Sequence, residues 1–291
     1  MSFTVFTDAC SNLPGRLLTQ LDIQVLPCSY TLDGVPGVFD GDMEKFDSHA
    51  YYDKLRAGAV MKTSLLNAEL FCSYFRPQLE QGRDIVYVGL SSGVSGTFQS
   101  ANIAAQELKE EFPQQCIRLV DSLGAAFGPG LLACMAADLR SAGNTAQQTA
   151  DILDEKVPHL LQFFTVDDLN FLKRTGRVSG ATAMIGSVLG IKPLLWGDPT
   201  GHIVAHSKCR GRKKAIDAIV EMYRTRVVDA QNQRIAISHG DCEEEALELG
   251  RRIREIAAPK ELIICPHEPF TGSHVGPGML ALFFFGTARE I

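Results

Sequence analysis

The chain has no long apolar run and no basic stripe. No stretch of the 291-residue sequence approaches the run of roughly 20 apolar residues that a membrane helix needs. Residues 1–8 show no basic segment followed by an apolar core, so we expect no signal peptide. The net charge of −6 disfavours nucleic acid as a main partner. We therefore expect a protein without a membrane span that does not bind nucleic acid.

Paired cysteines and phosphate-binding motifs are also missing. The eight cysteines are scattered, none forms Cys-x-x-Cys, and most lie in apolar runs, which indicates buried thiols in a reducing cytoplasm. The chain contains no Gly-x-x-x-x-Gly-Lys-Ser/Thr, and no Gly-x-Gly-x-x-Gly that opens a helix after a strand. No His, Asp and Glu cluster has metal-ligand spacing. We expect a cytoplasmic protein with neither a metal ion nor a cofactor.

Strand and helix patterns alternate through the first half of the chain. Strands are predicted at 3–7, 23–32, 84–90, 116–121 and 160–166, and helices at 14–21, 67–80, 96–111, 123–141 and 145–156. Such alternation is typical of a parallel sheet covered by helices on both faces. We expect an α/β/α domain over residues 1–168.

The second half has a different pattern. Strands are predicted at 191–196, 203–207, 234–238, 261–265 and 279–285, and helices at 167–174, 180–190, 211–227 and 243–257. The turn at 197–201 joins two of these strands into a hairpin. We expect residues 169–291 to form a smaller α+β domain with a mostly antiparallel sheet.

The loop after the strand at 84–90 reads Ser-Ser-Gly-Val-Ser-Gly-Thr and carries the strongest functional signal. Ser91, Ser92, Ser95 and Thr97 place four hydroxyls at the start of a helix, where backbone N–H groups also approach a ligand. Two other strands end in Thr-Asp at 7–8 and in Asp-Ser at 121–122, and the carboxyl ends of parallel strands meet at one rim. The loop is therefore either an ordinary capped turn or a site for an anion or a carboxylate.

His274 and Thr63 are two further candidates. His274 lies in Gly-Ser-His-Val-Gly-Pro-Gly at 272–278, a composition that predicts a constrained loop and not a helix face. It is either a turn histidine bonded to the backbone or a group that binds a carboxylate. Thr63 precedes a predicted helix and is either part of its cap or part of the same site.

The ionisable groups near the rim suit ligand binding better than catalysis. Residues 93–97 resemble a nucleophile elbow but do not match its glycine spacing. An alternative is a serine hydrolase or acyltransferase that uses Ser92 or Ser95 with His274. Asp8 or Asp121 would then have to orient the imidazole.

An ordered set of motifs resembles the DegV family of bacterial fatty-acid-binding proteins over nearly the whole chain. The set comprises Thr-Asp-Ala-Cys-Ser at 7–11, Lys-Thr-Ser at 62–64, the loop at 91–97, Asp-Ser at 121–122, Gly-Arg-Val-Ser at 176–179, Ile-Lys-Pro at 191–193, Arg-Gly-Arg-Lys-Lys at 210–214 and His-Val-Gly-Pro-Gly at 274–278. Two departures are Ala9, where the family has serine, and Leu-Leu-Asn at 65–67, where it has Gln-Pro-Ser.

The resemblance implies a DegV-like two-domain fold that holds one long-chain fatty acid, such as palmitate, stearate or oleate, between the domains. Its carboxylate would be bound by Thr63, by a serine among Ser91, Ser92 and Ser95 (Ser92 first) and by His274. The apolar wall of the acyl chain is expected from Ala181, Met184, Ile185, Val188 and Leu189.

The resemblance also implies a partner. DegV-type proteins are lipid-binding carrier subunits without a catalytic residue, and a separate fatty-acid kinase phosphorylates the bound carboxyl group to an acyl-phosphate for phospholipid synthesis. We expect Arg210 and Lys213 to contact that kinase, because a basic patch suits an acidic partner surface.

Overall fold

The computed structural model of the chain describes residues 3–179 and 190–290. The chain forms two compact units, the first made of Met1–Phe46 and Met61–Val157 and the second of Asp47–Val60 and Pro158–Ile291. These units differ from the predicted domains, 1–168 and 169–291, because the second also contains the inserted segment at 47–60 and the strand after Pro158. The two units are of similar size, whereas the sequence predicts a smaller second domain.

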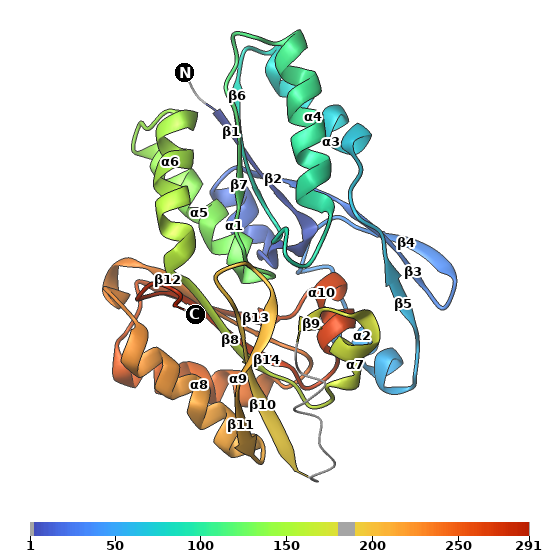
Figure 1. Cartoon of the computed structure of the whole chain (residues 1–291), viewed down its shortest axis with the longest axis vertical. Helices are drawn as coiled ribbons and strands as arrows, with labels where there is room; N and C mark the ends of the chain where they lie inside the picture. Colours follow the sequence, from blue (N-terminus) through green and yellow to red (C-terminus); the bar gives the residue numbers. More distant parts are fainter. Residues whose placement is uncertain (1–2, 180–189, 291) are drawn as a thin grey trace. The chain divides into compact units, whose positions relative to one another are not determined.

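A four-stranded parallel sheet forms the centre of the first unit (Figure 1). Its strands, in spatial order, are β2 (Ile23–Leu26), β1 (Phe3–Asp8), β6 (Asp84–Gly89) and β7 (Ile117–Asp121). β1 is buried along its whole length, as is β6 after its first residue. Because neighbouring strands run parallel, the carboxyl ends of β1, β6 and β7 meet at one rim, as predicted.

Helices cover both faces of this sheet. The helices of the first unit are α1 (Gly15–Gln20), α3 (Ala68–Glu80), α4 (Thr97–Glu111), α5 (Phe127–Ser141) and α6 (Ala146–Lys156). α3 and α4 lie on one face and α5 and α6 on the other (Figure 1). Thr145 caps α6 together with Gln148, each side chain bonded to the other's backbone. The predicted α/β/α arrangement is confirmed.

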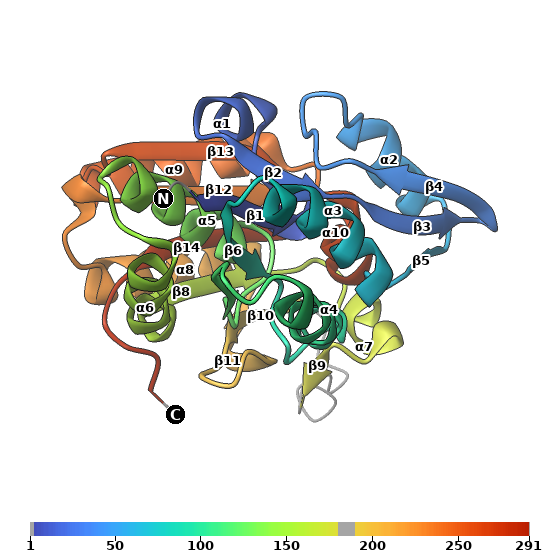
Figure 2. The same cartoon turned by 90° about the horizontal axis from the view of Figure 1, so that it is seen from above.

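The strand predicted at 23–32 is two strands in two different sheets. The chain leaves the parallel sheet at Pro27, which has no backbone N–H to continue a ladder. It then forms a three-stranded antiparallel sheet of β4 (Val35–Phe39), β3 (Cys28–Leu32) and β5 (Met61–Thr63), seen at the edge of Figure 2. This small sheet matters because its last strand carries Thr63.

A seven-stranded sheet forms the core of the second unit. Its strands, in spatial order, are β13 (Glu261–Pro266), β12 (Arg234–His239), β14 (Leu280–Phe285), β8 (Leu160–Thr165), β10 (Ile191–Gly197), β11 (Ile203–Arg210) and β9 (Val178–Ser179). β8 pairs antiparallel with β14 and β10 and so does not join the parallel sheet in which we expected it. Only the pairs β12–β13 and β11–β9 run parallel, so the described sheet is mostly antiparallel, as predicted.

Five described α-helices belong to the second unit. They are α2 (Ser48–Arg56), α7 (Asn170–Thr175), α8 (Arg212–Arg226), α9 (Glu243–Ile256) and α10 (Pro269–Val275). α8 and α9 pack against each other and against strands of the large sheet. α2 and α10 are not predicted by the sequence patterns, and the helix predicted at 180–190 falls almost entirely outside the described residues.

The helices are short relative to a lipid bilayer. Within residues 3–179 and 190–290, no helix combines the length and the apolar character needed to cross a membrane. The longest described helices have 15 residues. Each therefore extends about 22 Å, against a hydrocarbon thickness of about 30 Å.

Candidate functional site

The loop at 91–97 follows β6 and is fixed to the neighbouring strand end. Buried Ser91 donates its backbone N–H to the carbonyl of Gly124 at 2.9 Å, and its hydroxyl accepts the N–H of Gly93 at 3.0 Å. The carboxylate of Asp121 accepts the backbone N–H of Ser92 at 3.2 Å. Ser92 is exposed, and its hydroxyl has no hydrogen-bond partner among the described residues. Ser91 therefore supports the loop, and the Ser92 hydroxyl is left exposed.

Ser95 and Thr97 form the junction between the loop and α4. The Ser95 hydroxyl donates to the Thr97 hydroxyl at 3.1 Å and accepts the Thr97 backbone N–H at 3.2 Å. Thr97 is buried, and Ser95 is half-buried. Gly96 is the N-cap of α4 and the helix has no side-chain cap, so the Ser95 hydroxyl is used within the loop just before the helix.

The structure brings the Thr63 segment beside this loop. The buried backbone N–H of Leu66 donates to the Thr97 hydroxyl at 3.4 Å, although the two residues are 31 positions apart. Thr63 ends β5 opposite Tyr30 and is half-buried, and its hydroxyl has no partner in the described ranges. Thr63 and Ser92, both predicted to bind a carboxylate, thus lie on two segments that contact each other.

Asp8 supports the same rim by accepting three hydrogen bonds from its neighbours. Its buried carboxylate accepts the Tyr87 hydroxyl at 2.8 Å and the backbone N–H groups of Leu90 and Cys10 at 3.2 and 3.0 Å. Burial raises the pKa of Asp8, while the hydrogen bond from Tyr87 opposes that rise. The Asp121 carboxylate likewise accepts backbone N–H groups, from Ser92 and Leu123.

His274 lies in the last turn of α10, so the prediction that it occupies an irregular loop is wrong. A short helix begins at Pro269, with Glu268 as its N-cap, where the glycines alone suggested a turn. The His274 ring is half-buried, and its buried Nδ1 has no partner among residues 3–179 and 190–290.

The electrostatics of His274 favour a neutral imidazole. Burial, reinforced by the charges of Arg177 and Arg174, lowers the pKa of His274 to about 4. At neutral pH the ring therefore offers one N–H donor and one acceptor.

The predicted site residues thus fall into three groups. Thr63, Ser91, Ser92 and Ser95 belong to the first unit, where the structure brings them together, and His274 belongs to the second. The residues predicted for the acyl-chain wall lie outside the described part of the chain; they are Ala181, Met184, Ile185, Val188 and Leu189. Arg174, whose charge acts on His274, was not found from the sequence, because basic residues in the last turn of a helix are common and carry no functional signal.

The family of the chain is established by comparison with known proteins. A family model described as an uncharacterised protein of the DegV family matches residues 2–287. The chain belongs to the DegV family. It is 37% identical over 288 residues to a DegV domain-containing protein of Clostridium perfringens, and the match covers 99% of each chain.

Solved structures of other DegV proteins share the fold. One from Thermus thermophilus, described as fatty acid binding, is 29% identical with a TM-score of 0.88, covering 98% of this chain and 100% of that one. One from Thermotoga maritima, described as revealing a fatty acid binding function, is 26% identical with a TM-score of 0.84, covering 98% and 99%. The predicted family and fold are both confirmed.

The basic cluster at 210–214 of this DegV protein divides into two parts. Arg210, at the end of β11, and Lys213, in the first turn of α8, are exposed. Arg212 turns inward and pairs with Glu245 at 2.6 Å. The two residues predicted for partner contact are therefore accessible, as is Lys214, while Arg212 serves the packing of α8 on α9.

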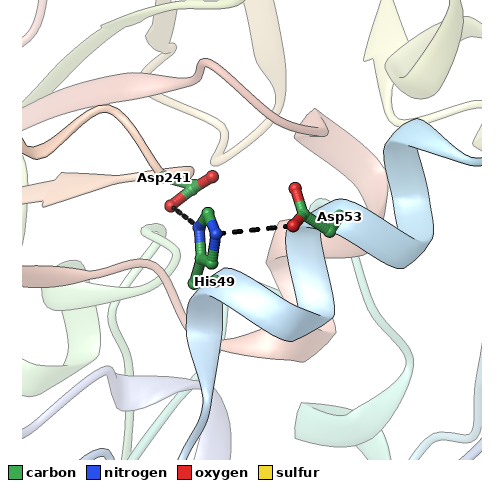
Figure 3. Close-up of side chains that lie close together, drawn as sticks. All are labelled: His49, Asp53 and Asp241. Atoms are coloured by element: carbon green, nitrogen blue, oxygen red, sulfur yellow. Dashed lines mark hydrogen bonds and ion pairs between the residues drawn. The ribbon is translucent and has the colours of Figure 1, made fainter.

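Three side chains in the described ranges of this DegV protein have the spacing of a metal-ion site: His49, Asp53 and Asp241 (Figure 3). His49 Nδ1 lies 3.0 Å from a carboxylate oxygen of Asp241, and its Nε2 lies 3.4 Å from Asp53. The guanidinium of Arg56 also bonds to both carboxylates, 2.8 Å from Asp53. Because Arg56 already supplies the positive charge, we interpret the cluster as an ion-pair network that fastens α2.

Proposed function

We propose that this DegV protein binds one long-chain fatty acid and that Thr63, Ser92 and His274 bind its carboxylate. The observation that carries the proposal is the exposed Ser92: Asp121 holds its backbone N–H at the rim, and its hydroxyl has no partner among the described residues. The Leu66–Thr97 hydrogen bond places the Thr63 segment next to it. The fatty acid binding named for two similar DegV structures supports the ligand class.

The chemistry of the three groups fits a carboxylate. Two hydroxyls and a neutral imidazole N–H each donate one hydrogen bond, worth about 1–3 kcal/mol to a desolvated anion. Arg174 and Arg177, whose charges help to lower the pKa of His274, provide a positive potential around the imidazole. An anionic head group at His274 is thereby favoured without a direct ion pair.

Most of the binding free energy is expected from the acyl chain. Burying about 16 carbons contributes on the order of 10 kcal/mol at about 0.8 kcal/mol per methylene. Ala181, Met184, Ile185, Val188 and Leu189 remain our predicted wall for that chain. A ligand held this way is expected to stay bound through purification.

The direct test is denaturing organic extraction of the purified protein followed by mass spectrometry. We expect near-stoichiometric long-chain fatty acid, and Ser92→Ala, Thr63→Ala and His274→Ala should each retain less of it. Ser73→Ala is the matched control, because the Ser73 hydroxyl is exposed and bonds to the Leu70 carbonyl of its own helix. An empty extract, no uptake of added oleate, and labelling of Ser92 by a phosphonate probe would together favour the hydrolase.

We also propose that this protein is a carrier for a fatty-acid kinase. The kinase would transfer the γ-phosphoryl group of ATP to a carboxylate oxygen, breaking the β–γ P–O bond and releasing ADP, so the carrier needs no catalytic residue. Exposed Arg210 and Lys213 are the proposed contacts. Arg210→Glu should block acyl-phosphate formation and leave bound lipid intact, while Arg254→Glu on α9, also exposed, should do neither.

A further inference from the structure

Four polar side chains of the second unit, three of them buried and Thr271 half-buried, form a continuous hydrogen-bonded relay. The Ser238 hydroxyl lies 2.7 Å from His267 Nδ1, and His267 Nε2 lies 2.7 Å from the Thr271 hydroxyl. The Thr271 hydroxyl in turn bonds to the carboxylate of Glu268. Ser238 and Glu268 have no exposed surface, and His267 is 3% exposed. We call this set the α10 relay, because two of its members lie on α10 or cap it.

The carboxylate end fixes the direction of every hydrogen bond in the α10 relay. Glu268 accepts the backbone N–H groups of Phe270 at 2.6 Å and of Thr271 at 2.9 Å, as an N-cap does. A carboxylate only accepts, so the Thr271 hydroxyl donates to it and must accept from His267 Nε2–H. His267 Nδ1 is then unprotonated and accepts from Ser238. The relay therefore selects one neutral tautomer of His267.

The α10 relay reaches the proposed ligand-binding residue through the helix itself. Thr271 and His274 are three positions apart on α10, so their side chains are neighbours on one face. The helix continues unbroken between them, with Gly272 N–H bonded to the Glu268 carbonyl at 3.0 Å and Gly276 N–H to the Gly272 carbonyl at 2.8 Å. A rotation of α10 at Thr271 would therefore also move His274.

Close packing leaves α10 little room for another position. The Tyr52 hydroxyl donates to the His267 carbonyl at 3.0 Å, and a Cβ on Gly272 would lie 2.6 Å from that hydroxyl. At the far end of α10, a Cβ on Gly276 would lie 2.5 Å from the Phe171 ring. α10 is therefore closely packed at Gly272 and Gly276, which limits how far the helix can shift.

We propose that Thr271 and Glu268 are positioning residues, which set the orientation of the His274 imidazole toward the fatty-acid carboxylate through the α10 relay. The proposal rests on the proposed function for the identity of the ligand. Neither residue needs to touch the ligand. Their role is to hold His274 in one orientation, which lowers the entropic cost of binding.

The test compares Thr271→Val, which keeps the shape of the side chain and removes the hydroxyl, with Thr271→Ser, which retains it. Two quantities are measured in the full chain: the Kd for oleate, and the histidine ring resonances in long-range 1H–15N NMR spectra. Thr225→Val is the matched control, because the exposed Thr225 hydroxyl bonds only to the Glu221 carbonyl of its own helix.

We expect Thr271→Val to raise the Kd for oleate about ten-fold, to shift the His274 resonances and to give His267 a mixture of tautomers. Thr271→Ser should restore all three, which a general loss of stability would not predict. Ser238→Ala removes the other end of the relay and serves if Thr271→Val does not fold; it should shift the Nδ1 resonance of His267, which loses its hydrogen-bond donor, and weaken binding.

An unchanged His274 resonance and an unchanged Kd in Thr271→Val would overturn the proposal, as would a Kd that Thr271→Ser fails to restore. The proposed function fails separately. If wild-type protein binds no oleate while Thr271→Val still moves the His274 resonances, the relay positions His274 for a different ligand.

Discussion

The carboxylate of Asp121, the last residue of β7, accepts the backbone N–H of Ser92, which lies in the loop that follows the neighbouring strand β6, at 3.2 Å. The same carboxylate accepts the N–H of Leu123 at 3.1 Å and so joins its own loop to the serine loop. Because β6 and β7 pair in parallel register, with Gly89 opposite Asp121, their ends reach the rim side by side. The orientation of Ser92 is therefore a consequence of the sheet.

Removal of this carboxylate should weaken fatty-acid binding more than folding. In Asp121→Ala, two backbone N–H groups of the rim lose their acceptor, and we expect the Kd for oleate to rise about ten-fold. Asp121→Asn keeps one carbonyl oxygen as acceptor and should give a smaller rise. Asp151→Ala is the control, since it removes an exposed carboxylate from α6. An oleate Kd that is the same in all three variants would contradict the role of Asp121.

The rim could be predicted from the sequence because each strand that ends there is recognisable from its own residues. The run at 84–90 is apolar and β-branched enough to indicate a buried strand, and parallel strands end at a common edge. Thr145 is recognisable as a cap from its own position, and the structure adds Gln148 as its partner. Patterns within one element were therefore sufficient for the layers of the first unit.

The second unit shows what local patterns do not contain. β8 is buried at every position, and a fully apolar strand fits the centre of a parallel or an antiparallel sheet equally well. Its place is decided by pairing with β14, more than 100 residues later. α10 was missed because its seven residues include glycine and proline; Glu268, which caps it, was the available signal.

The end of α10 provides a second test, of stability. Gly276 has φ of +77° and packs against Phe171, whereas Gly143 has φ of +90° and no atom within 4 Å of the position that a Cβ would take. Gly143→Ala therefore reports backbone strain alone, roughly 1–2 kcal/mol. Gly276→Ala adds the collision with Phe171, and we expect its free energy of unfolding to fall by roughly 1–3 kcal/mol more. Equal losses in urea unfolding would show that Phe171 moves aside freely.

The ion-pair network on α2 should depend on pH (Figure 3). The hydrogen bond from His49 to Asp241, with the charges of Asp241 and Asp53, raises the pKa of His49 above 6.5. Stability from protonated His49 is then fully present below pH 6.5 and is lost as the pH rises through the raised value. In urea unfolding, His49→Gln should therefore be less stable than wild type in acid and converge with it in mildly alkaline buffer. A stability difference between His49→Gln and wild type that grows as the pH rises would contradict this role of His49.

Buried His267 should give the stability of the protein the opposite pH dependence. Burial, with His239 nearby, lowers the pKa of His267 from 6.5 to about 3, so the unfolded chain binds a proton that the folded chain excludes. Wild-type stability is then unaffected above pH 6.5 and falls below it, by at most about 1.4 kcal/mol per pH unit for this group.

His267→Gln removes this proton linkage together with the hydrogen bonds of the α10 relay. We expect the variant to be less stable than wild type at neutral pH, and the difference to shrink as the pH falls toward about 5. The measurement is the free energy of unfolding in urea across that range, with His49→Gln as a control whose difference should grow over the same interval. If the stability difference from wild type changed in the same direction with pH for both histidine variants, His267 would be taking up a proton in the folded state. The single tautomer that defines the α10 relay would then be lost.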